Sequence, residues 1–461
     1  MDLIIPKSID GTIIKSISSS ILSGKTFNSI TISPNITSIG QGVLAGVIVN
    51  RLNLDYATGL TSLSLLGIKS NDVVIACSNN LTTIHDSMDS NIANLEVKNL
   101  KELKTIEENA FKDTQLTSLT LSNLSKLETI GANAFATSTD AEKKIASLTL
   151  SNLSNLTTIG EGAFSNQGIS ALTIKGLSNL KTIGSKAFEQ NKISSISFDE
   201  MPNVTTIDNN AFLSNPLTSL DFRGAEKLTE IGGSAFASSK DFKTIDFSGL
   251  SQNINGTLVA TTGTVDTLNF SNTGAYMTNF INNNISSFSN IKEINLNDSA
   301  ITELILQSRN IETINLKGSS ITKFTDSNGS NKISKLDFSN LSNLKTIYIN
   351  SEENLSTLNV KGSTNLESIT CKNCTKLTKI NTIGLNNLNT LSMPGCQAIT
   401  TVGISKSIPA TSGNLLITSG ASNNLTCVQI DGDNTRFNTS EFNSYFPGAS
   451  TSVIKSSCNF D

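Results

Sequence analysis

The sequence is poor in the residue types on which most enzymes and nucleic-acid-binding proteins depend. It has no tryptophan, a single histidine (His85), four tyrosines and only 16 % charged residues among its 461 positions. The formal net charge is −4, and no run of Lys or Arg suggests nucleic acid. A Ser–His or Cys–His pair would have to use His85, and no acid–base pair, metal cluster or phosphate-binding loop stands out in the sequence. We therefore expect no enzyme activity, no metal and no cofactor.

Long apolar runs are also missing. The longest, such as Val43–Val49, fall far short of the roughly 18 residues that span a bilayer, so we expect no membrane span. The start of the chain, Met1–Lys7, lacks the basic and apolar regions of a signal peptide. Either the protein stays inside the cell or a leader is absent from this sequence. Six cysteines are too few for a disulfide scaffold and do not decide the compartment.

What the sequence has in abundance is a repeated segment. Residues 145–168 read IASLTLSNLSNLTTIGEGAFSNQG, and residues 169–192 read ISALTIKGLSNLKTIGSKAFEQNK. The repeats start 24 residues apart at Ile145, Ile169, Ile193 and Leu217, and the same text appears upstream from Ile92 and from Leu116. A fixed period of this length indicates a solenoid of stacked coils. The low hydrophobic content of 37 % suits the thin core of such a fold.

Each repeat has the pattern of one coil. Apolar and hydroxyl residues alternate in Ser147–Ser151, as in a short strand with one buried face. Leu153 and Leu156 then point inward, and Gly160 suits a turn that needs positive φ. The following Ala163–Phe164 returns a ring to the core. One coil cannot close a core alone, so neighbouring coils must bury each other's faces.

The regularity of the repeats changes along the chain. Five segments are expected: irregular repeats and a cap at 1–90, regular repeats of about 24 residues at 91–250, an irregular junction at 251–290, repeats of 20–22 residues at 291–400, and a C-terminal cap at 401–461. In the regular array one ring recurs at the same position of each coil and is expected to stack inside the solenoid: Phe135, Phe164, Phe188, Phe212 and Phe236.

The repeat text resembles a known family. Met201–Phe212 reads MPNVTTIDNNAF and Ile32–Gly40 reads ISPNITSIG. Both resemble the line Ile-Pro-x-x-Val-Thr-x-Ile-Gly-x-x-Ala-Phe of the BspA-type leucine-rich repeats of bacterial and protozoan surface proteins, and the resemblance extends over about residues 30–240. Where the family often has a Cys after Ala-Phe, this chain has Ser, Thr, Gln or Asn. The resemblance implies a leucine-rich-repeat solenoid, a right-handed β-rich superhelix with short strands and turns or short helical segments, that is exposed on a cell surface and adheres to host proteins or other cells.

Single residues with chemical potential have ordinary structural interpretations. His85 fills the turn position that Gly160 and Gly184 fill in later coils, so we interpret it as a turn residue. The segments 326–330 and 431–434 resemble calcium-binding loops, but neither has the Gly and the closing Glu at the offsets of an EF-hand. We interpret both as surface turns.

The cysteines near the end of the chain leave their pairing open. Cys371 and Cys374 have C-x-x-C spacing, but no second pair and no His follows at a zinc-site distance. Cys374 and Cys396 are one local coil apart and are expected about 4.8 Å from each other, either as stacked thiols or as a disulfide. Cys427 and Cys458 flank the expected cap and form a second candidate pair.

The outward residues of the strands are the remaining candidates for a binding site. Hydroxyls occupy the central outward position in the middle coils, and carboxylates and amides occupy it further along the chain. The proposed partner-binding patch consists of Thr149, Thr173, Lys175, Ser197, Asp199, Asp221, Arg223 and Asp246. This patch is either a docking strip or a solvated face whose polar ladders stabilise the stack, with charges that neutralise one another as exposed pairs.

Two functions therefore remain. The first is a surface or secreted recognition module, an adhesion protein that binds a protein or a glycan, host-derived in the case that the resemblance implies. The alternative is a structural or scaffolding repeat protein without a dedicated ligand. In both cases we expect a monomer that binds no nucleic acid.

Overall fold

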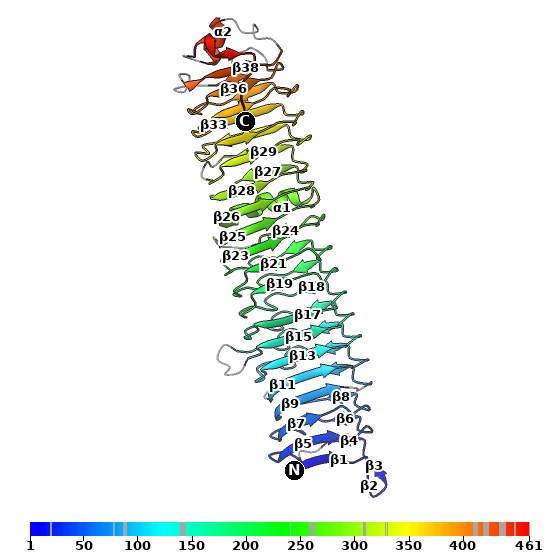
Figure 1. Cartoon of the computed structure of the whole chain (residues 1–461). Helices are drawn as coiled ribbons and strands as arrows, with labels where there is room; N and C mark the ends of the chain where they lie inside the picture. The colour runs from blue at the N-terminus through cyan, green and yellow to red at the C-terminus, as the bar shows by residue number, and fades with distance from the viewer. Residues whose placement is uncertain are drawn as a thin grey trace. The chain divides into compact units, whose positions relative to one another are not determined.

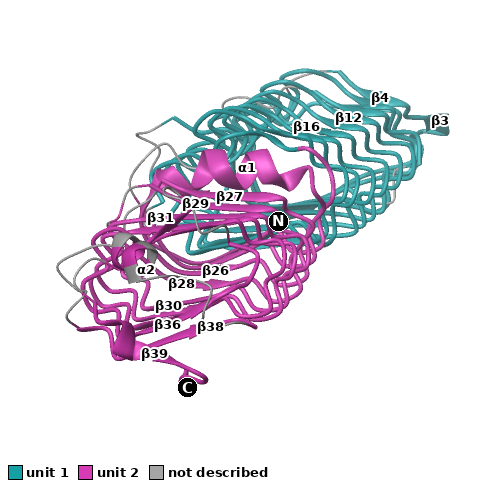
Figure 2. Cartoon of the chain, turned by 90° about the horizontal axis from the view of Figure 1, so that it is seen from above, with its two compact units in different colours: residues 1–240, 254–260 teal, residues 241–253, 261–461 magenta. Residues whose placement is uncertain are grey.

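The computed structural model of the protein describes residues 1–18, 21–76, 79–85, 90–138, 144–239, 241–258, 263–307, 310–327, 329, 331–408, 414–417, 424–432, 439–446 and 449–460. The chain divides into two compact units, which Figure 2 shows in different colours. Unit 1 comprises Met1–Lys240 and Ile254–Ala260, and unit 2 comprises Asp241–Asn253 and Thr261–Asp461. Each unit is a stack of short, mostly parallel strands with little helix, which confirms the predicted solenoid. The five segments expected from the sequence stay predictions.

Unit 1 has two ladders of strands, one on each side of its coils (Figure 1). The main ladder is an eight-stranded parallel sheet in the order β1-β5-β7-β9-β11-β13-β15-β17. Its strands are β1 (Asp2–Ile5), β5 (Thr26–Ile32), β7 (Ile48–Asn53), β9 (Lys69–Ala76), β11 (Asn91–Lys98), β13 (Ser118–Ser122), β15 (Ser147–Ser151) and β17 (Ala171–Lys175). Further along the chain, β19 (Ser195–Ser197) pairs with β21 (Ser219–Asp221).

The second ladder consists of two-residue strands, most of them with the sequence Thr-Ile. It contains an eight-stranded sheet of β10 (Thr83–Ile84), β12 (Thr105–Ile106), β14 (Thr129–Ile130), β16 (Thr158–Ile159), β18 (Thr182–Ile183), β20 (Thr206–Ile207), β22 (Glu230–Ile231) and β24 (Asn255–Gly256). A three-stranded sheet contains β4 (Ser16–Ile17), β6 (Ser38–Ile39) and β8 (Ser62–Leu63). A separate hairpin pairs β2 (Ser8–Ile9) with β3 (Thr12–Ile13).

The period-two pattern of the repeat explains the main ladder. In β15, Leu148 and Leu150 are completely buried, whereas Thr149 between them points outward and is partly exposed. The register is in phase, because Leu148 pairs with Leu119 of β13 and with Leu172 of β17. Equivalent positions of successive coils therefore lie directly over one another.

The predicted ring ladder is present and starts one coil earlier than expected. Six phenylalanines stack in succession with ring centroids 5.1–5.5 Å apart: Phe111, Phe135, Phe164, Phe188, Phe212 and Phe236. Each of these side chains is at most 1 % exposed. The last ring, Phe236, also packs edge-on against Phe222, with centroids 5.8 Å apart. The Ala-Phe element thus forms a continuous aromatic column along unit 1.

A second column, made of buried polar side chains, lies beside the rings. Nδ2 of Asn191 donates to the carbonyl oxygens of Phe164 (2.9 Å) and Phe188 (3.0 Å), and its Oδ1 accepts from the N–H of Ile169 (3.1 Å). Asn215 repeats these contacts one coil later. Other buried members are Thr114, Gln167 and Ser239. These are the residues that stand where the family often has Cys, and they satisfy main-chain groups that the turn leaves unpaired.

We predict that Phe188→Ala lowers the free energy of unfolding of unit 1 by about 3–5 kcal/mol, because the truncation leaves a cavity between two stacked rings. Urea melts followed by circular dichroism measure this loss, and the exposed Lys192→Ala serves as the control. A Phe188→Ala protein as stable as the parent would contradict the role of the rings in the core.

We predict that Asn191→Leu, which keeps the branched shape and the number of heavy atoms of the side chain, costs about 2–4 kcal/mol because it leaves buried main-chain donors and acceptors without partners. The matched control is Asn179→Leu in the same coil, since Asn179 is exposed and makes one hydrogen bond to Ser154. Equal melting midpoints for the two variants would show that the buried amide contributes no more than a surface amide.

Unit 2 has shorter coils and again two ladders. On one side lie β23 (Asp241–Asp246), β25 (Gly263–Asn269), β26 (Phe288–Asn295), β28 (Ile311–Asn315), β30 (Lys335–Asp337), β32 (Thr357–Asn359), β34 (Lys379–Asn381), β36 (Thr401–Ile404), β38 (Cys427–Ile430) and β39 (Ile454–Lys455). The other side is one sheet of β27 (Glu303–Leu306), β29 (Lys323–Asp326), β31 (Thr346–Asn350), β33 (Ser368–Lys372), β35 (Thr390–Ser392) and β37 (Leu415–Leu416).

Helices are short and lie at two places in unit 2. Helix α1 (Met277–Asn284) continues into the 3-10 turn Ile285–Ser287 and lies beside β27 (Figure 2). Its Phe280 ring packs edge-on against Phe247, with centroids 5.1 Å apart. Helix α2 (Thr439–Tyr445) and the 3-10 turn Thr451–Val453 follow the last long coils, and the Phe442 and Phe446 side chains of that region are completely buried.

Candidate functional site

The main ladder of unit 1 is interrupted between β17 and β19. The strands β15 and β17 pair along their full length, and β19 pairs with β21, but β17 and β19 share no ladder. On the other side of the same coils the pairing continues from β16 through β18 to β20, and the Phe164, Phe188 and Phe212 rings remain stacked. The coils thus stay joined at the rings and the second ladder while the main ladder opens.

The break exposes side chains that are buried elsewhere in the array. Leu172 and Ile174 of β17 are partly exposed, whereas the equivalent Leu148 and Leu150 of β15 are completely buried. Main-chain groups of β17 and β19 are left open as well. Ala171 and Lys175 bond to the β15 side, so the N–H and C=O groups of Leu172 and Ile174 point toward β19.

The opposite edge of the break belongs to β19. The Phe198 N–H donates to the Asp221 carbonyl oxygen on the β21 side. Because the main-chain direction alternates along a strand, the groups of Ser195 and Ser197 point toward β17. Two strand edges therefore face each other without pairing. At one end the break is bridged by the Gly176 N–H, which donates to Oε2 of Glu200 over 3.0 Å.

The turn that follows the strand changes at the break. After β11, β13, β15 and β17 the next residue has positive φ: Asn99 (56°), Asn123 (54°), Asn152 (55°) and Gly176 (69°). In three of these coils the N–H of this left-handed residue donates to the main chain of the following coil, as Asn152 does to Lys175. The coil of β19 has Glu200 at that position, and its φ is not positive. A residue that rarely adopts the left-handed region thus replaces Asn or Gly where the ladder opens.

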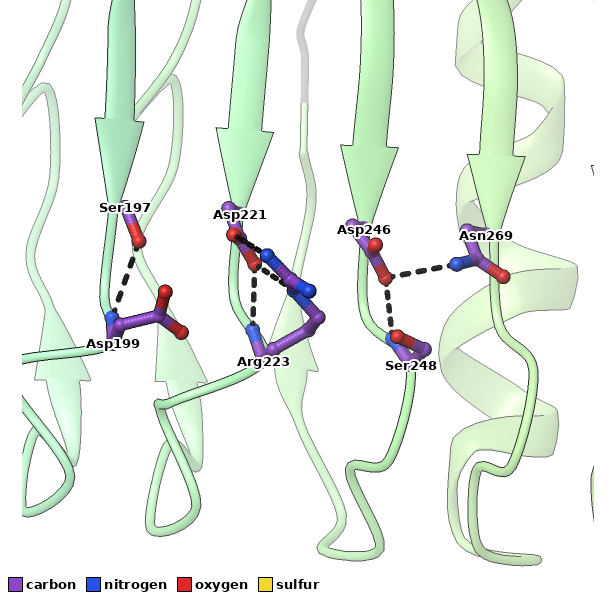
Figure 3. A network of polar contacts seen from close by, with 7 residues as sticks. All are labelled: Ser197, Asp199, Asp221, Arg223, Asp246, Ser248 and Asn269. Atoms are coloured by element: carbon purple, nitrogen blue, oxygen red, sulfur yellow. Dashed lines mark hydrogen bonds and ion pairs between the residues drawn. The ribbon is translucent and has the colours of Figure 1, made fainter.

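The side chains of the predicted patch fall into two groups. Thr149, Thr173 and Lys175 point outward on β15 and β17, and their side chains make no hydrogen bond or ion pair with another residue that the structure describes. Ser197 and Asp221, by contrast, are used by their own turns, because each accepts a hydrogen bond from the N–H two residues later, at Asp199 (3.3 Å) and Arg223 (3.1 Å) (Figure 3). Such turns explain why hydroxyl and carboxylate residues follow the threonines at this position.

Arg223 and Asp221 also form an ion pair within one coil. Nε and Nη2 of Arg223 donate to the two carboxylate oxygens of Asp221 over 2.9 and 2.6 Å (Figure 3). The hydrogen bonds and charge of Arg223 lower the pKa of Asp221 below its usual value, against the opposing effect of burial. The pair is thus formed inside one coil, whereas the sequence suggested neutralisation between adjacent coils. The Arg223 side chain remains 55 % exposed.

Asp246, the last residue of the predicted patch, belongs to unit 2. It accepts from the Ser248 N–H (2.8 Å) and from Nδ2 of Asn269 (3.1 Å) (Figure 3), and Asn269 in turn accepts from the Ser271 N–H. The same turn recurs at Asp337 and Asn359. In unit 2 the outward carboxylates and amides therefore end strands and link neighbouring coils.

The remaining single-residue candidates lie elsewhere. His85 follows β10 at the surface, and its Nδ1 lies 2.8 Å from Oε2 of Glu107 in the next coil. Asp431 accepts from the Gly384 N–H over 3.3 Å, and Asp433 and Asn434 lie outside the described residues. The interpretation of segment 326–330 as a surface turn is wrong for Asp326, which is completely buried at the end of β29.

Asp326 belongs to a buried carboxyl pair that the sequence did not suggest. Glu352 is also completely buried, and Nδ2 of Asn331 donates to both acids, at 3.1 Å to Asp326 and 3.0 Å to Glu352. Burial, followed by the contact with Asp326 and its charge, raises the pKa of Glu352 to about 8. The two acids therefore share a proton at neutral pH, because two buried carboxylates cannot both be ionised at low cost.

We predict that the stability of unit 2 falls as the pH rises from about 4.5 to about 8. In this window the folded protein holds a proton that the unfolded chain releases, so deprotonation favours unfolding. Melting temperatures across the window should decline less steeply in Glu352→Gln than in the parent. The exposed neighbour provides the matched control Glu353→Gln, which should follow the parent. Parallel pH profiles for all three proteins would contradict the shared proton.

The cysteines differ from the expected pattern. Cys371 is bonded to Cys374, with Cα atoms 6.4 Å apart, and Cys396 is a buried free thiol. Both expectations for Cys374 and Cys396, a disulfide or two stacked thiols, are therefore wrong, because Cys374 is bonded to Cys371 of its own coil. Cys427 and Cys458 form a disulfide with Cα atoms 5.9 Å apart.

Comparison with known proteins identifies the repeat. The family model described as the BspA-type leucine-rich repeat region, in six copies, matches residues 15–142, 140–262 and 205–328. The chain belongs to the BspA-type leucine-rich repeat family. Leucine-rich repeats of this kind are in general protein-interaction modules, and their solenoid is typically a non-enzymatic binding scaffold. A comparison with curated proteins finds no match.

Solved structures that resemble this BspA-type chain share little sequence with it. A leucine-rich repeat protein from Bacteroides ovatus is 13 % identical, with 99 % of this chain and 91 % of that chain covered and a TM-score of 0.33. A leucine-rich cell surface protein from Faecalibacterium prausnitzii is 14 % identical, with 74 % and 87 % covered and a TM-score of 0.24. The pneumococcal vaccine antigen PcpA is 12 % identical, with 83 % and 90 % covered and a TM-score of 0.29.

Within the part of the chain that the structure describes, no helix has the length and apolar character of a membrane span.

Proposed function

We propose that the protein is a recognition module, displayed on or secreted from a cell, that binds a protein partner through the outward face of unit 1. The observation that carries the proposal is the break between β17 and β19. It leaves two strand edges and the partly exposed Leu172 and Ile174 in the middle of the predicted patch. The surface location rests on the resemblance to surface proteins of the same repeat family.

A protein is the partner class that fits this break. An extended peptide supplies N–H and C=O groups at the spacing of a strand, so it can bond to both open edges, and its alternate side chains can contact Leu172 and Ile174. A glycan lacks such a regular main chain, and it would leave these groups to water. The residues beside the break provide a polar rim: Thr149, Thr173, Lys175, Ser197 and Asp199.

The alternative of a scaffold without a dedicated ligand also has an observation in its favour. Asp221 and Ser197 already serve their own turns, and Asp246 serves a turn in unit 2, so part of the polar surface has a structural use. This use does not extend to Thr149, Thr173 and Lys175, nor to the open edges. Binding of a partner at the break between β17 and β19 would distinguish a recognition module from a scaffold.

We predict that Ser195→Pro leaves the melting temperature almost unchanged, because proline removes an N–H that faces the break and has no strand partner. The equivalent residue two coils earlier, Ser147, faces the paired strand β13. Ser147→Pro should therefore be destabilising by about 3 kcal/mol. Equal losses of stability in both variants would show that the edge of β19 is not open in solution.

Binding is tested with the full chain against two defined probes, a library of random linear peptides and a glycan array. The proposal expects that peptides with alternating apolar residues bind the parent and the Ser147→Ala control. These peptides should not bind the variants Ser195→Pro and Thr173→Arg. The same arginine substitution at Thr182, which lies on the second ladder of the same coil, should have no effect. Binding of glycans alone would overturn the protein partner, and no binding to either probe would favour the scaffold.

A further inference from the structure

Three cysteines of unit 2 converge although they come from two coils. Cys371 is an inward residue of β33, Cys374 lies in the turn after it, and Cys396 lies in the corresponding turn after β35. Their sulfur atoms all lie within 4.8 Å of one another, and the three side chains are at most 1 % exposed. The group lies directly beneath a surface turn, because Lys372 and Asn373 between the first two cysteines reach the solvent.

A fourth sulfur-bearing residue lies next to this group. Thr370 of β33 pairs with Ser392 of β35, so the next residues, Cys371 and Met393, occupy equivalent positions of adjacent coils. Met393 is completely buried. The two coils thus carry Cys371-x-x-Cys374 and Met393-x-x-Cys396 one above the other. This arrangement places the Met393 side chain next to three cysteine sulfurs in the core.

The group has an oxidised and a reduced form. In the structure Cys371 and Cys374 are joined, and Cys396 keeps its thiol, which donates to the Cys371 carbonyl oxygen over 3.2 Å. Burial raises the pKa of the Cys396 thiol to about 11, so it stays neutral and is a poor nucleophile toward the neighbouring disulfide. A thiol reductant that delivers two electrons and two protons to the disulfide converts the group into three thiols.

We propose that, in the reduced chain, Cys371, Cys374, Cys396 and Met393 form a binding site for a single soft metal ion, Cu⁺. Thiolate and thioether sulfurs are the ligands that select Cu⁺, whereas Ca²⁺ and Mg²⁺ take oxygen ligands. Among the described residues no histidine or carboxylate joins the three cysteines. A structural zinc site takes four nitrogen or sulfur ligands, and a thioether is not among the usual ones.

Binding of Cu⁺ releases protons from the cysteine thiols. Cu⁺ replaces the thiol hydrogens of the cysteines that coordinate it, and these protons pass to the solvent, so the affinity rises with pH. Reoxidation of Cys371 and Cys374 removes two ligands at once. The site therefore exists only where thiols are kept reduced, and the disulfide of the structure is its closed form.

The experiment uses the full chain, reduced with a phosphine under nitrogen and titrated with Cu⁺ against a chromophoric chelator. We expect one tightly bound Cu⁺ per chain and an X-ray absorption spectrum with sulfur neighbours only. Cys396→Ser should lower the affinity by more than roughly 100-fold, since losing an outer-shell partner alone costs about 10–100-fold. Met393→Leu should weaken binding less.

The double variant Cys427→Ser/Cys458→Ser is the matched control, because it removes two other cysteines of unit 2 and should keep the tight Cu⁺ site. Circular dichroism shows that each variant is folded, and the absorption spectrum of the parent tests the ligands without any substitution. The proposal is overturned if Cys396→Ser binds Cu⁺ as the parent does, if nitrogen or oxygen neighbours dominate the spectrum, or if the reduced chain prefers Zn²⁺ to Cu⁺.

Discussion

Stacking of equivalent positions in successive coils is the constraint on which the rest of this structure depends. No coil has a core of its own, so each inward side chain is buried in large part by the coils before and after it. Leu148 therefore lies between Leu119 and Leu172, and Phe188 lies between two other rings. A position that suits one coil must suit its neighbours, and this requirement produces the columns of identical residues.

The same constraint allows polar columns in the core. Asn191 and Asn215 are acceptable inside unit 1 because each amide bonds to main-chain carbonyls of two coils, and these carbonyls recur at every step. The carboxyl pair of unit 2 shows the limit of this tolerance. Asp326 and Glu352 lie side by side in the core, and the raised pKa of Glu352 means that they remain buried by sharing a proton. In a repeated coil a buried amide finds main-chain hydrogen-bond partners at every step, whereas a pair of buried carboxyl groups must keep a proton between them.

The sequence predicted what repeats and missed what departs from repetition. The alternation in Ser147–Ser151 and the recurrence of Ala-Phe were enough for the strands and the ring column, because a fixed period makes positions equivalent. The residues in place of the family's Cys were noticed, but their role depends on which carbonyls the turn leaves unpaired, and only coordinates show this. Glu200 follows four coils that have Asn or Gly at this position, but Pro34 and Tyr56 fill it in earlier coils whose strands pair, so the sequence contained no clear signal of the break.

Whether the predicted patch binds anything stays a proposal, and the structure shows only that its side chains differ in what they already bond to. From the sequence, Thr149, Thr173, Lys175 and Asp221 were equally good candidates for partner contacts. The hydrogen bonds show that Asp221 is used by its own turn. Sequence patterns cannot distinguish these uses, because a carboxylate that caps an N–H and one that awaits a partner look alike.

The open edges also change where binding energy would come from. The face has no Trp, since the chain contains none, and Arg223 is already held by Asp221, so side-chain anchors of the usual kind are scarce there. Strand addition does not need such anchors, because main-chain hydrogen bonds provide affinity and shallow apolar contacts provide register. Under the proposed function, a hydroxyl-rich solenoid with an interrupted main ladder would in this way recognise an extended segment while the rest of its face remains hydrated. The specificity would then lie in how the partner's alternate side chains contact Leu172 and Ile174, the two apolar residues that the break uncovers.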